Sequence, residues 1–309
     1  MLEVKNITKI YGKKVVVNDL SFTLEKGEIL GFLGPNGAGK STTMNIITGY
    51  IGATSGSVSI GGHDTLDDVN KVKGKIGYLP EIPPVYSDMT IEEYLKFVCE
   101  LKKVKKSETK DVIDNVMKLV RIDHVRGRLI KNLSKGYKQR VGIAQAVIGN
   151  PEIIIFDEPT VGLDPKEIVE IRKLIKDIGK NKTVILSSHI LSEIEEVCDR
   201  ILIINNGEFV AIGTKEELQK KLGNSNVISL SIKGEEDEIT SVLNSVMGVE
   251  EVIYLGSNKE FVHDFTLNLS YGQDPREIIF YKLSDKKLPI LSMKKDDLDL
   301  EKIFLQITN

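Results

Sequence analysis

A glycine-rich segment in the first part of the chain has the spacing of a phosphate-binding P-loop. It reads Gly34-Pro35-Asn36-Gly37-Ala38-Gly39-Lys40-Ser41-Thr42, between a short apolar run and a helical pattern. Glycines let successive backbone N–H groups curl around phosphates, and the N-terminus of the next helix adds partial positive charge. The pattern predicts that Lys40 reaches the β- and γ-phosphates of a nucleotide and that the Ser41 hydroxyl binds Mg²⁺.

Two adjacent carboxylates, Asp157 and Glu158, follow a wholly apolar run at residues 153–156. Such a run is typical of a buried parallel strand, so both carboxylates are expected at the C-terminal tip of that strand. One carboxylate can hold Mg²⁺ while the other polarises the attacking water, and a general base contributes about 10²–10⁴ in rate. The pair therefore indicates that the chain hydrolyses the nucleotide as well as binding it.

The order of the apolar patterns predicts an α/β core with a largely parallel sheet. Residues 2–24 alternate apolar and polar side chains around a turn at Gly12, which favours an antiparallel hairpin, and residues 91–120 repeat apolar side chains at helical spacing. Further strands are expected at residues 28–33, 57–60, 76–79, 153–156, 183–186, 201–204 and 208–212, and further helices after Lys40, after Ser134 and at residues 168–178 and 191–198.

A charged stretch at residues 215–221, followed by Gly223-Asn224-Ser225-Asn226, predicts a domain boundary. Beyond it, strands are expected at residues 227–232, 251–255, 265–269 and 290–293, and helices near residues 238–247 and 275–283. These patterns predict a small α+β unit, and it carries no enzymatic motif.

Charge and hydropathy exclude several classes of protein. The net charge of −3 over 309 residues gives no basic bias that would indicate nucleic acid as a partner. The longest stretch without acid or base, residues 41–62, is broken by Gly, Ser and Thr, so the chain is not expected to cross a membrane. Cys99 and Cys198 are interpreted as free thiols of a reduced protein, with a disulfide as the alternative, and no Cys/His cluster has metal-ligand spacing.

Further motifs, in order along the chain, resemble those of ABC ATPases. Residues 133–140, Leu-Ser-Lys-Gly-Tyr-Lys-Gln-Arg, are similar to the signature motif of that family, and Val161-Gly162-Leu163-Asp164 is similar to its dimer-contact loop. Ser187-Ser188-His189 resembles the histidine switch that senses the γ-phosphate, and Tyr11, with Val16 beside it, resembles the aromatic that stacks on adenine.

The resemblance implies an ATPase that uses ATP and Mg²⁺ and works as a head-to-tail dimer. Lys40, Glu158 and His189 would be the catalytic residues. Nucleotide-binding residues would be Tyr11, Val16, Gly34, Pro35, Asn36, Gly37, Ala38, Gly39, Lys40, Ser41, Thr42, Ser134, Gly136 and Asp164, and Ser41, Asp157 and Glu81 would hold the metal. The implied partners are a second ATP-binding subunit, expected as a homodimer, and a separate polytopic membrane permease, with no nucleic acid. The implied location is peripheral, on the cytoplasmic face of the cell membrane.

Two departures from the usual family pattern are informative. Glu81 stands where the family commonly has Gln, so the position keeps an oxygen for Mg²⁺ or water but lacks an amide donor. Lys135 and Tyr137 replace the commoner Gly and Gln of the signature, while Ser134 and Gly136 remain. Both departures, and the similarity of residues 298–305 to the end of an accessory domain, resemble the ABC-2-type exporter branch with its drug, antibiotic, sodium and gliding-associated systems.

The resulting expectation is an α/β P-loop ATPase domain at residues 1–218, with an antiparallel β subdomain and a helical subdomain at about residues 84–150. A C-terminal α+β accessory domain is expected at residues 219–309. The main alternative is a soluble ABC ATPase that acts on nucleic acid or ribosomes. A nucleotide-binding scaffold without turnover is disfavoured because Glu158 and His189 are both present.

Overall fold

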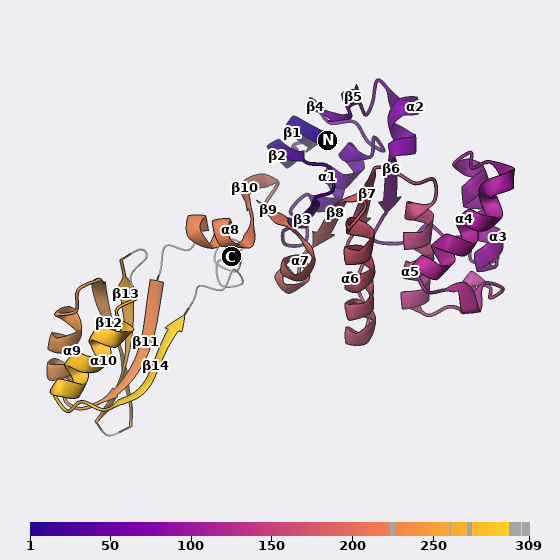
Figure 1. Cartoon of the computed structure of the whole chain (residues 1–309). Coiled ribbons are helices and arrows are strands. Elements are labelled where there is room, and N and C mark those ends of the chain that lie inside the picture. The colour runs from indigo at the N-terminus through magenta and orange to yellow at the C-terminus, as the bar shows by residue number, and fades with distance from the viewer. Residues whose placement is uncertain (223–225, 260, 271–273, 297–303, 305–309) are drawn as a thin grey trace. The chain divides into compact units, whose positions relative to one another are not determined.

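The structure, a computed structural model, describes residues 1–222, 226–259, 261–270, 274–296 and 304. The chain divides into two compact units, Met1–Lys215 and Glu216–Ile307 (Figure 1). No helix in these described ranges is long and apolar enough to cross a membrane. Cys99 and Cys198 are both free thiols.

The described part of the first unit is built on a ten-stranded sheet with the order β5-β4-β1-β2-β10-β9-β3-β8-β7-β6. The strands are β1 (Leu2–Tyr11), β2 (Lys14–Leu24), β3 (Ile29–Leu33), β4 (Ser55–Ile60), β5 (His63–Asp64), β6 (Ile76–Leu79), β7 (Ile153–Asp157), β8 (Thr183–Ser188), β9 (Arg200–Asn205) and β10 (Glu208–Gly213). The helices are α1 (Lys40–Ile47), α2 (Val69–Val72), α3 (Ile91–Leu101), α4 (Lys106–Leu119), α5 (Lys135–Val147), α6 (Pro165–Gly179) and α7 (Leu191–Val197), with single 3-10 turns at Lys73–Lys75, Asp123–Val125 and Ile130–Asn132.

The central strands of this sheet are parallel and fully buried. Every residue of β3, β7 and β8 is buried, as expected for strands that are covered on both faces. The order β9-β3-β8-β7-β6 is parallel throughout, whereas β1, β2, β4 and β5 form an antiparallel part. The α/β core and its antiparallel subdomain are therefore confirmed.

The register of the parallel strands brings three motifs to one edge of the sheet. Leu33 of β3 pairs with Ser188 of β8, and Asp157 of β7 pairs with Ser187 of β8. Because neighbouring parallel strands end at the same edge, the P-loop, the two carboxylates and the loop of His189 meet there. This is the usual ligand-binding edge of an open α/β sheet.

Three helices, α3, α4 and α5, pack against one another and form the helical part of the first unit (Figure 1). The first of them begins at a capping box, because the Thr90 side chain accepts from Glu93 N at 3.3 Å and Glu93 Oε2 accepts from Thr90 N at 2.8 Å. Ser134 caps α5 by accepting from Tyr137 N, so this helix begins directly after Ser134, as the sequence predicts.

The second unit has the element order β11-α9-β12-β13-α10-β14 after a first helix, α8 (Lys215–Leu222). The elements are β11 (Asn226–Lys233), α9 (Glu236–Asn244), β12 (Val249–Lys259), β13 (Val262–Leu269), α10 (Arg276–Asp285) and β14 (Ile290–Asp296). Its described strands form an antiparallel sheet in the order β12-β13-β11-β14, which is the ferredoxin-like arrangement, and α9 and α10 cover one face of it (Figure 1).

The predicted α+β unit is thus confirmed, and the charged stretch before it is itself helical. That stretch forms α8, which carries Glu216 and Glu217 in its first turn and buries Leu218. Acidic side chains near a helix N-terminus interact favourably with the helix dipole, so these two residues stabilise a helix at this position. The predicted linker residues 223–225 lie outside the described residues, as does the motif at residues 298–305 apart from Phe304.

Candidate active site

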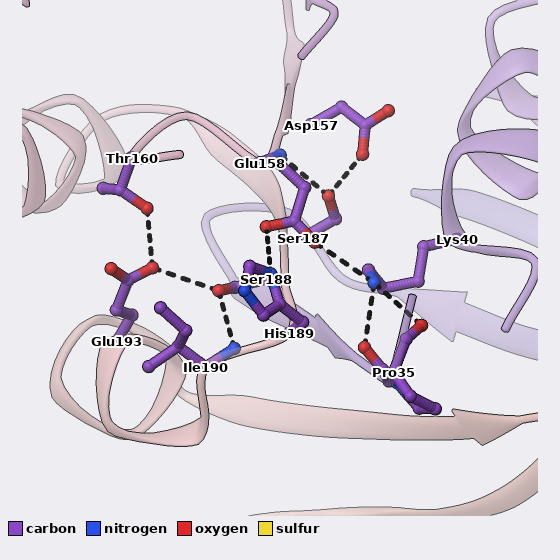
Figure 2. Close-up of polar contacts among 11 residues, drawn as sticks. Pro35, Lys40, Asp157, Glu158, Thr160, Ser187, Ser188, His189, Ile190 and Glu193 are labelled. Atoms are coloured by element: carbon purple, nitrogen blue, oxygen red, sulfur yellow. Dashed lines mark hydrogen bonds and ion pairs between the residues drawn. The ribbon is translucent and has the colours of Figure 1, made fainter. Parts of the chain in front are cut away.

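The ammonium group of Lys40 is turned back onto its own P-loop. Nζ donates to Gly34 O at 2.8 Å and to Pro35 O at 3.2 Å, and it lies 3.1 Å from Glu158 Oε1 (Figure 2). Only 5 % of the Lys40 side chain is exposed. A buried ammonium with this set of oxygen partners is placed to bind phosphate oxygens that enter the loop.

The turn from β3 into α1 depends on Gly39, the residue before the helix. Its φ of 102° lies in the left-handed region, and a Cβ there would stand 2.6 Å from the Val16 carbonyl oxygen. Both constraints require glycine. The helix α1 therefore begins directly after the P-loop, and the free N–H groups at its N-terminus can bind an anion there.

A cavity of about 480 Å³ lies beside the P-loop. Its lining residues are Lys14, Val16, Asn36, Gly37, Gly39, Lys40, Ser41, Thr42, Glu81, Glu158, Val161 and His189. All of these except Lys14 and Val161 were predicted site residues. The fold thus assembles one pocket from segments that are far apart in the sequence.

Glu158 and His189 face each other at one side of this cavity. His189 Nδ1 lies 2.9 Å from Glu158 Oε2, and 36 % of the His189 side chain is exposed against 7 % of the Glu158 side chain (Figure 2). The backbone of Glu158 has a φ of 49°, and its N–H donates to Ser187 Oγ at 3.0 Å. A non-glycine residue in this region stores about 1–3 kcal/mol of strain, and such strain clusters at functional sites.

Asp157 and Ser41 have the chemistry of a Mg²⁺ site. Asp157 is buried and accepts from Ser187 Oγ. Burial raises the pKa of Asp157, while hydrogen bonds from Ser187 and Ser41 oppose that rise. Mg²⁺ prefers one or two protein oxygens plus substrate phosphates and water, and a cation there would offset the cost of burying the carboxylate. The residues present therefore fit Mg²⁺.

Comparison with known proteins decides the family. The sequence pattern of the family described as ABC transporter matches residues 17–161. The linearmycin resistance ATP-binding protein LnrL of Bacillus subtilis is 35 % identical over 313 residues, which cover 100 % of this chain and 98 % of that protein. The chain belongs to the ABC transporter family.

Two further similarities agree with this family. The bacitracin transport ATP-binding protein BcrA of Bacillus licheniformis is 38 % identical over 72 % of this chain and 72 % of its own length. A dimeric structure of a post-hydrolysis state of the ATP-binding cassette MJ0796, bound to ADP and Pi, is 28 % identical with a TM-score of 0.64 and covers 69 % of this chain and 98 % of that one. The chain is an ATP-binding and ATP-hydrolysing subunit of an ABC transporter.

Several predicted residues of this ABC ATPase do not line the P-loop cavity. Tyr11 is 51 % exposed, and Lys9 Nζ lies 5.1 Å from the centre of its ring. Ser134 caps α5, and Asp164 caps α6 by accepting from Glu167 N at 2.9 Å. The remaining predicted residues outside the lining are Gly34, Pro35, Ala38, Gly136 and Asp157. Ser134 and Gly136 therefore lie outside the lining of the P-loop cavity of their own subunit.

Besides Val161, two residues at or beside the site were not predicted from the sequence. Lys14 lines the cavity from the start of β2, but the sequence showed it only as part of a turn. Glu193 is buried beside Thr160 and Ser188, although the sequence showed it only within an expected helix. The sequence contains one sign that Glu193 is buried: it lies between Leu191 and Ile194, two apolar residues on the buried face of α7.

Proposed function

We propose that this subunit powers an exporter, in which two copies bind ATP and Mg²⁺ head to tail and drive a separate membrane permease. The observation that carries the proposal is the series of contacts from Lys40 through Glu158 to His189 beside the P-loop cavity. It joins a cation that can bind phosphate, a carboxylate that can orient and deprotonate water, and a histidine that contacts this carboxylate.

Each of these residues has a chemical role in the proposal. Lys40 and the N–H groups of the P-loop bind the β- and γ-phosphates. Glu158 accepts the proton of the attacking water, and His189 holds that carboxylate while its exposed edge faces the γ-phosphate. Mg²⁺, held by Ser41, Asp157 and Glu81, would neutralise charge that develops on the phosphates. Tyr11 and Val16 would contact adenine.

The signature residues are proposed to act on the nucleotide of a second copy. Ser134 and Gly136 do not line the cavity that contains Lys40, although the start of α5 offers an N-terminus to an anion. A head-to-tail dimer would supply that anion from the partner. Asp164, at the start of α6, is proposed to lie at the same interface.

A second cavity, which Glu81 helps to line, supports the proposal that a protein partner binds next to this residue. It measures about 700 Å³ and has Tyr50, Ile82 and Pro84 in its lining. Tyr50 is 80 % exposed and Ile82 is 81 % exposed, so large apolar side chains face solvent next to the nucleotide site. Exposed apolar surface of this kind marks interaction sites. We assign it to a cytoplasmic segment of the permease, which would hold this subunit peripherally on the cytoplasmic face of the membrane.

Export and the accessory domain are supported by the comparisons. LnrL and BcrA are named for antibiotic resistance and antibiotic transport, and the match to LnrL extends over the whole chain. Residues 1–218 are proposed as the ATPase domain, with the helical subdomain at about residues 84–150. Residues 219–309 are proposed as an accessory domain, which the match to LnrL also covers.

The test is a tagged pull-down from detergent-solubilised native membranes with mass spectrometry of the proteins that co-purify. Recovery of a polytopic membrane protein with the wild type, and its loss with Ile82→Asp, is the expected result. Lys13→Ala serves as a surface control that should retain the partner. Recovery of ribosomal or DNA-bound proteins instead would overturn the transport assignment.

A further inference from the structure

We propose that Glu193 is a positioning residue that sets the distance between the loop after Glu158 and the loop of His189. The inference rests on the proposed roles of Glu158 and His189. Glu193 is on α7, and its side chain is 5 % exposed. It does not line the P-loop cavity, so it acts through other residues.

One oxygen of Glu193 joins the two loops. Thr160 Oγ1 donates to Glu193 Oε2 at 2.6 Å, and Ser188 Oγ donates to the same atom at 3.0 Å (Figure 2). Ser188 Oγ in turn accepts from Ile190 N at 3.0 Å. Thr160 and Ser188 are themselves 5 % and 1 % exposed, so the contacts are shielded from water.

The position of these donors links them to the reaction. Thr160 follows Glu158 by two residues, and the next residue, Val161, lines the cavity. Ser188 immediately precedes His189. A shared acceptor therefore fixes both segments relative to one atom, and displacement of either one moves Glu158 or His189.

Burial makes this arrangement costly unless the carboxylate is satisfied. A buried carboxylate without hydrogen bonds is strongly unfavourable, and the partners that the structure gives to Oε2 are two hydroxyl groups. An apolar residue on this buried face of α7 would pack without that cost. The presence of a carboxylate at this buried position therefore indicates that its role is to hold the two loops together.

The experiment compares Glu193→Ala, Glu193→Gln and Thr160→Val with wild type. Turnover is normalised to the stoichiometry of bound nucleotide, so that unfolded protein does not count. Glu193→Ala should lower kcat by on the order of tenfold or more, with KM for ATP within about twofold, because small misplacements of reacting groups are costly. Glu193→Gln keeps an oxygen acceptor and should restore most of the turnover. Glu196→Ala, on the same helix and 55 % exposed, should match wild type.

A double-mutant cycle completes the test. Thr160→Val should lower kcat by itself but lower it little further in the Glu193→Ala background. Both changes remove the same hydrogen bond, the one from Thr160 Oγ1 to Glu193 Oε2. Wild-type kcat in both Glu193→Ala and Thr160→Val would overturn the inference. Failure of Glu193→Gln to recover activity would also overturn it. Absence of ATP turnover in the wild type would instead refute the proposed roles of Glu158 and His189. If Glu193→Ala does not fold, Thr160→Val and Glu193→Gln decide the question.

Discussion

Lys40 Nζ lies 3.1 Å from Glu158 Oε1, with 5 % and 7 % of the two side chains exposed. Within the described residues, Oε1 has an ion-pair contact but no hydrogen bond of good geometry. Lys40 also donates to two P-loop carbonyls. A γ-phosphate must therefore compete with Glu158 for Lys40, and the two anions also repel each other.

Glu158→Gln removes the negative charge from this contact. ATP affinity is expected to stay intact or rise, because Lys40 becomes available to phosphate and the repulsion disappears. Hydrolysis should fall by about 10²–10⁴ because the general base is lost. Size-exclusion chromatography with ATP should show a trapped dimer, and rapid hydrolysis by this variant would contradict the assignment.

Lys40→Ala removes the cation at the base of the P-loop. Tight nucleotide binding should be lost, because the phosphates lose their charge-assisted contact. Fluorescence titration with ATP and with ADP measures the change, and thermal unfolding shows that the protein is folded. Unchanged affinity would exclude the P-loop role of Lys40.

Lys14 is the first residue of β2 and Lys13 directly precedes it, so the two lysines can be compared as test and control. Lys14 lines the P-loop cavity and Lys13 does not. Lys14→Ala is expected to weaken ATP binding by several-fold and to reduce its salt dependence, because a cation near phosphates acts through charge. Lys13→Ala should leave both quantities unchanged, and equal effects of the two changes would assign the loss to net charge alone.

Asp157 predicts how Mg²⁺ dependence changes with pH. Burial raises its pKa, so the carboxylate is fully ionised only above that raised value and is protonated earlier than an ordinary Asp as pH falls. The Mg²⁺ concentration needed for half-maximal ATP turnover should therefore rise as the pH falls through the titration range of Asp157. Asp157→Asn should have weak affinity without this pH-dependent part, and removal of Mg²⁺ with EDTA should stop turnover in the wild type. The same pH profile in both proteins would exclude Asp157 as the origin.

Gly31 of β3 predicts a difference in stability. A Cβ there would lie 2.3 Å from Ile194 Cγ2 on α7, so Gly31→Ala should destabilise the protein by about 1–3 kcal/mol through overpacking. Gly74→Ala is the control, because nothing lies within 4 Å of its Cβ position. It should be neutral or stabilise slightly by restricting the unfolded chain. Chemical denaturation compares the two, and equal midpoints would refute the packing argument.

Much of the site could be predicted because its parts are local in the sequence. The P-loop is a strand, a turn and a helix in one continuous segment, and Ser134 caps the helix that directly follows it. The apolar run before Asp157 likewise predicts a buried strand with a carboxylate at its end. Such features depend on backbone preferences and periodicity, which a sequence shows directly.

The tertiary structure decided which of these segments meet. The order β3-β8-β7 brings Lys40, Glu158 and His189 together, and it also places Glu193 between two loops that are far apart in the sequence. Lys14 joins the cavity only because β2 crosses beside the P-loop. Strand order, register and the packing of α7 depend on contacts between distant residues, and no local pattern specifies them.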